Sequence, residues 1–116
     1  MSIQSRGVRD RRAVSRVRAN LECRFTFEEL VQDAHITNIS LNGALILSPC
    51  LPPEESHIVL TITSPLLKTP LTIGSNVVRT ECVSADGIGA FAVVFSHSSL
   101  DLIELIKNLI SQPFRN

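Results

Sequence analysis

Apolar and polar residues alternate along most of the chain, a pattern typical of half-buried β-strands. The first clear example is Leu21–Phe27, where charged or hydroxyl residues that would face water separate the apolar ones. The same period of two predicts five further strands, at about Val31–Ile39, Gly43–Leu47, His57–Thr63, Leu71–Val83 and Ile88–Phe95. Gly74, inside the longest of these, suggests a β-bulge.

Turn signals separate the strands. Asn42-Gly43 is a strong hairpin signal because both residues tolerate a positive φ, and Asp86-Gly87 is a second turn. Prolines in the segments 49–53 and 65–70 mark loops, since proline removes the backbone donor that a central strand needs.

The last segment changes its period to about 3.6 residues, which predicts a helix. Its apolar stripe consists of Leu102, Ile103, Leu105, Ile106, Leu109 and Ile110. Ser98 with Asp101 resembles a capping box at its start, and Pro113 ends it. About six short antiparallel strands and one C-terminal helix predict an all-β barrel or sandwich, with the helix packed on its mouth or side.

Charge is balanced overall, with 11 basic and 11 acidic residues in 116, which argues against a general polyanion binder. The balance is uneven along the chain. Residues 1–24 carry seven arginines and two acidic residues, a balance of +5 that leaves −5 for the remainder. Because residues 1–15 also lack apolar periodicity, we expect a flexible basic arm there, followed by one domain over residues 16–116.

The N-terminus has no apolar signal-peptide core, and no segment has the roughly 18 apolar residues of a membrane helix. We therefore expect a cytoplasmic protein without membrane insertion. Cys23, Cys50 and Cys82 are odd in number and far apart, which fits neither a disulfide framework nor a zinc site. They are interpreted as reduced, half-buried strand residues.

Catalysis has little support in the sequence. His35, His57 and His97 fall on separate elements, and no nucleophile, carboxylate or glycine-rich loop accompanies them at the spacing of a catalytic site. The acidic pairs Glu28-Glu29 and Glu54-Glu55 fall at turns, where solvated charge explains them. We expect no enzyme activity, no metal and no cofactor.

Three arginines cluster in the segment Arg11-Arg12-Ala13-Val14-Ser15-Arg16. A guanidinium group can bind a phosphate bidentately, bond the O6/N7 edge of guanine or stack on a purine. The cluster suits a compact dianionic purine ligand. The alternative is that an arginine-rich tail contains such pairs by chance and only keeps the protein soluble.

The second constellation is Asn38-Ile39-Ser40-Leu41-Asn42-Gly43, at the junction of two predicted strands. In extended geometry Asn38 and Ser40 leave the same face and offer an amide and a hydroxyl together. Gly43 would give backbone freedom or a close approach. A polar hairpin without any ligand is the alternative explanation.

Together, Arg-x-x-x-Arg and Asn-x-Ser-x-x-Gly, with 22 positions from Arg16 to Asn38, resemble the paired motifs of the PilZ domain family. Asn76-Val77-Val78-Arg79 is similar to the family's Val-Val-Arg strand. Gly87-Ile88-Gly89 followed by Phe95 resembles its last strand, and a C-terminal helix comes next. The resemblance covers residues 9 to about 110. Two departures are mild, because Asn38 is an accepted residue at its position and Asn76 stands where the family often has glycine.

The resemblance implies a six-stranded antiparallel barrel that binds cyclic di-GMP. Arg12 and Arg16 would hold guanine and phosphate from the arm, and Arg11 would contact a second nucleotide, giving two ligands per chain. The barrel would contribute the rest of the ligand-binding set, which the resemblance implies to be Asn38, Ser40, Gly43 and Arg79.

The function expected from the resemblance is that of a receptor whose arm closes over the ligand and which signals to an unidentified protein partner. One alternative is a degenerate interaction module that binds no nucleotide. The other, a small nucleic-acid binder, is disfavoured by the −5 balance after residue 24 and by the lack of exposed aromatic candidates on the strands.

Overall fold

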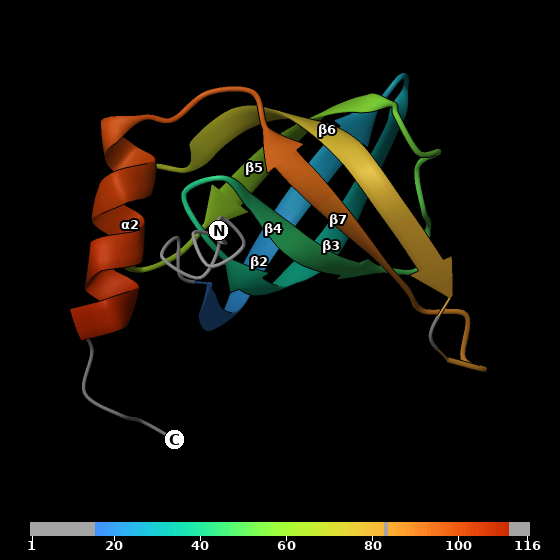
Figure 1. The fold of residues 1–116 in the computed structure, drawn as a ribbon, viewed down its shortest axis with the longest axis horizontal. Helices are drawn as coiled ribbons and strands as arrows, with labels where there is room; N and C mark the ends of the chain where they lie inside the picture. Colours follow the sequence, from blue (N-terminus) through green and yellow to red (C-terminus); the bar gives the residue numbers. More distant parts are fainter. Residues whose placement is uncertain (1–15, 83, 112–116) are drawn as a thin grey trace, which may run out of the picture.

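The computed structural model describes residues 16–82 and 84–111. The chain runs through β2 (Val17–Phe27), β3 (Leu30–Ile39), β4 (Gly43–Ser48), β5 (His57–Thr63), β6 (Leu71–Cys82), β7 (Gly89–Phe95) and α2 (Leu100–Ser111). The strands form one closed barrel in the order β2-β3-β4-β7-β6-β5, with every neighbouring pair antiparallel. Helix α2 lies against one end of this barrel (Figure 1). The predicted barrel with a C-terminal helix is confirmed.

The barrel forms because the period-two pattern puts one apolar face of every strand inside. Phe25 and Phe91 are buried in the core with edge-to-face rings, whose centroids are 5.2 Å apart. Leu102, Leu105 and Ile106 of α2 belong to the same buried cluster. The helix therefore extends the core of the barrel.

The predicted strand ends lie within one residue of the observed ones except at the start of β2, and two further differences concern the bulge of β6 and the start of the helix. β2 begins at Val17, four residues before the predicted start, because Val17 and Ala19 are half-buried and continue the inward face. The bulge of β6 falls between Val77 and Arg79, while Gly74 pairs regularly with Val59. The absence of a side chain at Gly74 leaves room for the imidazole of His57, because a Cβ at Gly74 would lie 3.2 Å from that ring.

The helix start is the third difference. Ser99, and not Ser98, caps α2, because its Oγ accepts a hydrogen bond from the backbone N–H of Leu102 at 3.1 Å. Asp101 then lies in the first turn, where a carboxylate interacts favourably with the helix dipole, and it does not complete a capping box.

Positive φ angles in the described residues occur at Glu28 (54°), Glu55 (72°) and Gly87 (89°). The Asp86-Gly87 turn is confirmed, and so is the hairpin at Asn42-Gly43, where β3 and β4 pair antiparallel although neither residue has a positive φ. Both acidic pairs are exposed at turns as predicted. Glu54 is not only solvated, because its Oε2 also accepts a hydrogen bond of 3.1 Å from the backbone N–H of Thr80.

Two cysteines have described side chains, and both are free. Cys23 is a strand residue as predicted, but it is buried and not half-buried; Cys50 is half-buried as predicted, but it lies in the loop after β4 and not in a strand. Burial, with a smaller contribution from the charge of Asp33, raises the pKa of the Cys23 thiol to about 12. The stability gained by keeping this thiol neutral is fully present below about pH 9 and is lost as the pH rises towards 12.

We therefore expect Cys23 to resist thiol reagents in the native protein at pH 8, because the thiolate is the reactive form and burial denies access. Peptide mass mapping after brief alkylation should find Cys23 unmodified and Cys50 modified faster. Alkylation in denaturant should remove the difference. Equal labelling of both cysteines in the folded protein would contradict the burial of Cys23.

Among the residues that the structure describes, no helix is both long and apolar enough to cross a membrane.

Candidate functional site

The residues predicted to bind a ligand fall into two groups. Arg11 and Arg12 lie outside the described residues. Arg16 is exposed and directly precedes β2, and Asn38 is half-buried near the end of β3. Ser40 and Gly43 bracket the short loop between β3 and β4.

The register of β2 and β3 brings these groups together. Val17 pairs with Ile39 and Arg18 pairs with Asn38, so Arg16 and Ser40 are the next residues outward along the two chains. Directly paired residues share one face of a sheet. Ile39 is buried inside the barrel, and Arg18 and Asn38 therefore lie on the outer surface.

An irregularity in β3 turns Asn38 outward. Ile36 and Asn38 are two residues apart and would share a face in a regular strand. The register between β3 and β4 shifts between them, at Thr37, so Ile36 points into the core while Asn38 faces out. The Thr37 hydroxyl lies 3.5 Å from the carbonyl oxygen of Leu45.

Ser40 differs from the expectation, because it is only 7% exposed and its hydroxyl is turned towards its own loop. Its Oγ accepts hydrogen bonds from the backbone N–H groups of Asn42 at 3.1 Å and Gly43 at 3.3 Å. The backbone N–H of Ser40 also donates to the carbonyl of Gly43 at 2.8 Å. Ser40 thus shapes the loop, and the two contacts to its oxygen leave its hydroxyl hydrogen as the group that can face a ligand.

Gly43 is explained by a close approach to β7. A Cβ at this position would collide with the carbonyl oxygen of Val93 and lie 3.1 Å from its carbonyl carbon. The loop is also fixed to β7 by the hydrogen bond from the N–H of Phe95 to the carbonyl of Asn42, at 2.7 Å. The close approach that was predicted for Gly43 exists, and its partner is the protein backbone.

Arg79 lies on the same outer surface but not beside Asn38. Cross-strand pairing runs in one row through Arg18, Asn38, Leu45, Ala92 and Arg79, from β2 to β6. We call these five residues the outer row. Leu45 and Ala92, both half-buried, form an apolar stretch in its middle, and an exposed arginine stands at each end. Sequence reasoning missed Arg18, although its spacing of two from Arg16 is the signal that places both on one face.

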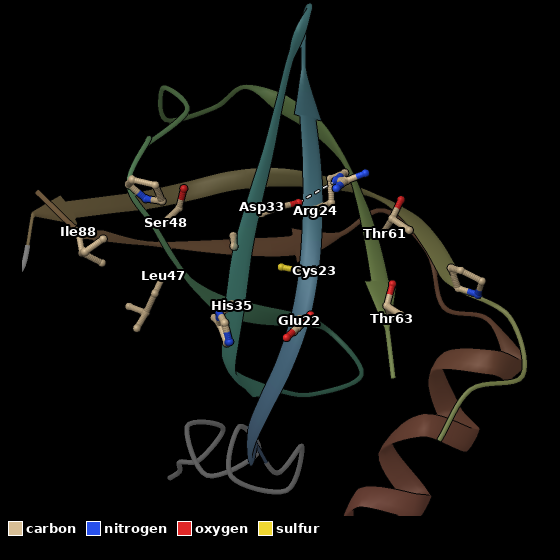
Figure 2. Close-up of a pocket in the computed structure, with 13 residues that line it drawn as sticks. Glu22, Cys23, Arg24, Asp33, His35, Leu47, Ser48, Thr61, Thr63 and Ile88 are labelled. Atoms are coloured by element: carbon tan, nitrogen blue, oxygen red, sulfur yellow. Dashed lines mark hydrogen bonds and ion pairs between the residues drawn. The ribbon is translucent and has the colours of Figure 1, made fainter. Parts of the chain in front are cut away.

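One hollow on the described surface lies elsewhere. Figure 2 shows side chains of β2, β3, β4 and β5 around this depression of about 810 Å³, which contains none of the predicted site residues. Arg24 donates from Nε to Asp33 at 2.8 Å (Figure 2), and this contact raises the pKa of the guanidinium. The hollow is lined by two carboxylates, Glu22 and Asp33, and by one arginine, Arg24, which is already paired with Asp33. This balance of charge is unsuited to a dianion.

Comparison with known proteins is in line with this assignment of the fold. The model of the PilZ domain matches residues 10–112. The chain belongs to the PilZ domain family. PilZ domains are receptor or binding domains rather than enzymes. A search of curated proteins found no match.

Two solved structures resemble the PilZ domain described here. The Bacillus subtilis inhibitor of motility (MotI/DgrA) has a TM-score of 0.62 and 17% identity over 84% of this chain. The match covers 51% of MotI/DgrA, so this PilZ domain spans about half of that protein's length. The PilZ domain of YcgR from Escherichia coli, solved with c-di-GMP, has a TM-score of 0.60 and 12% identity, and the match covers 82% of this chain and 84% of that one. At these identities the likeness shows the shared fold.

Proposed function

We propose that this PilZ domain is a receptor for cyclic di-GMP that does no chemistry on it. The observation that supports this most is the register at the start of β2, where Arg16 and Arg18 run alongside Asn38 and Ser40. The YcgR domain, which has the same fold, was solved with this ligand.

The proposed contacts follow from the chemistry of each group. The Asn38 amide carries both donors and an acceptor and suits the edge of a guanine, and the Ser40 hydroxyl can donate one further bond. The guanidinium of Arg16 would hold phosphate or guanine from the side of β2, and Arg12 would join it from the segment before the barrel. Gly43 contributes by setting the shape of the loop.

Binding is proposed to order the arm over the ligand. Ordering some six residues costs roughly 1 to 2 kcal/mol each in backbone entropy. Charge-assisted hydrogen bonds worth about 1.5 to 3 kcal/mol apiece offset this cost. The affinity should therefore be moderate and should fall as salt screens the arginine contacts.

The output is proposed to be a protein–protein contact that depends on where the arm lies. The arm would cover or uncover part of the outer surface when the ligand binds, which is an order–disorder switch. MotI/DgrA is described as an inhibitor of motility, but the match covers only half of it. The partner of the present chain is therefore left as an unidentified protein.

Calorimetric titration tests the proposal. The wild-type chain is expected to bind cyclic di-GMP with micromolar or tighter affinity and two ligands per chain, because Arg11 adds charge that can neutralise a second dianion. It should ignore single-stranded DNA at physiological salt. Absence of binding to cyclic di-GMP, or equal binding of the two, would falsify the receptor assignment. An endpoint of one ligand per chain would contradict only the predicted stoichiometry of two and would leave the receptor assignment standing.

A further inference from the structure

We propose that Arg18 is an additional ligand-binding residue and that its guanidinium holds a phosphate of the nucleotide beside Asn38. This inference rests on the proposed function and assigns to the same site a residue outside the Arg-x-x-x-Arg and Asn-x-Ser-x-x-Gly patterns. It is carried by the pairing of β2 with β3.

The geometry puts Arg18 within reach of anything that Asn38 touches. The two residues are direct cross-strand partners on the outer face. Cβ atoms of such partners lie about 4.5 to 5.5 Å apart. A ligand group bound by the Asn38 amide would therefore lie within reach of the guanidinium at the end of the longer Arg18 side chain.

The charge of Arg18 is available for a ligand. Within residues 16–82 and 84–111 the structure has one ion pair, Arg24–Asp33. The acidic residue of β2 is Glu22, which is four residues from Arg18 and lies beyond the register shift between Arg18 and Leu21. Arg18 is exposed, so moving its guanidinium onto a phosphate breaks no ion pair between described residues.

The spacing of Arg16 and Arg18 favours phosphate over the base edge as the partner of Arg18. Two residues of extended chain separate their Cα atoms by about 6 to 7 Å, and both lie on the outer side of the barrel. A cyclic dinucleotide carries two phosphodiester groups with one negative charge each. Two cations along one edge can neutralise both, while the Asn38 amide is left to read the guanine.

The test uses the full chain with Arg18→Ala and Arg18→Lys, and calorimetric titration with cyclic di-GMP at low and physiological salt. The controls Lys68→Ala and Lys107→Ala remove the same charge from exposed positions that are not part of the outer row. Thermal unfolding of every variant without ligand checks the fold. Because Arg18 is exposed, we expect the melting temperatures of both Arg18 variants to stay near that of the wild type.

Arg18→Ala is expected to weaken binding roughly 10-fold and to reduce the salt dependence of the affinity, while the controls change it less than about 2-fold. Arg18→Lys should recover part of the loss, because an ammonium still pairs with a phosphate. A lysine variant as weak as the alanine variant would overturn the proposed phosphate contact, because an ammonium keeps part of a contact made through charge and loses a contact that depends on the planar guanidinium.

The failures are distinguishable. Wild-type binding with an unchanged affinity in Arg18→Ala would overturn the role of Arg18 and leave the receptor function standing. No binding by the wild type would overturn both.

Discussion

Replacing Gly43 with alanine is expected to destabilise the barrel by about 3 kcal/mol, the upper end of the usual cost of overpacking. The added Cβ would collide with the carbonyl oxygen of Val93, and a backbone carbonyl in a paired strand cannot rotate away as a side chain can. Relief requires β4 and β7 to separate. For a domain of this size the melting temperature should fall by roughly 10 °C or more.

Gly74→Ala is the matched control, because it adds the same methyl group to another strand of the barrel. There the Cβ would lie 3.2 Å from ring atoms of His57, an exposed side chain that can shift. We expect a change below about 1 kcal/mol. Urea unfolding of both variants measures the two costs, and a Gly43→Ala protein as stable as Gly74→Ala would contradict the close packing of β4 on β7.

This expectation affects how the motif is interpreted. Asn-x-Ser-x-x-Gly contains one outward side chain, Asn38, and two residues that build the loop, Ser40 and Gly43. A variant of Gly43 that loses ligand binding would therefore report on folding, whereas a variant of Asn38 would report on contact with the ligand.

The strands were predictable from sequence because a closed barrel imposes the same rule on every strand, with apolar residues in and polar residues out. His57–Thr63 agrees with the prediction at both ends. The irregularities were not predictable, since each depends on a partner strand. Thr37 and Val78 are offset against β4 and β7, and no local signal marks either position.

The same limit applies to the candidate site. The motif residues were found from their spacing, but the outward turn of Asn38 depends on the irregularity at Thr37. The burial of Ser40 follows from hydrogen bonds within its own loop. The pairing of Arg18 with Asn38 needs the register across β2 and β3, because a shift of one residue would move Arg18 to the inner face.

The second large effect is expected for Arg12→Ala and Arg16→Ala, each of which should weaken binding of cyclic di-GMP by roughly 10- to 150-fold. This range corresponds to the loss of one charge-assisted contact, about 1.5 to 3 kcal/mol. Arg16 is exposed and precedes β2, so its removal takes nothing from the buried cluster. Arg12 lies outside the described residues, and its role is inferred from the motif.

Titration of both variants beside the wild type measures the effect, with Lys68→Ala as the control for the loss of one positive charge. Ligand-free melting temperatures should stay within a few degrees of the wild type, because an exposed arginine contributes little to stability. A large fall in melting temperature would instead show that this segment supports the barrel. A dianion held at the start of β2 would lose one of its nearest cations in either variant. If the wild type binds and both arginine variants bind with unchanged affinity, the ligand binds elsewhere on the protein.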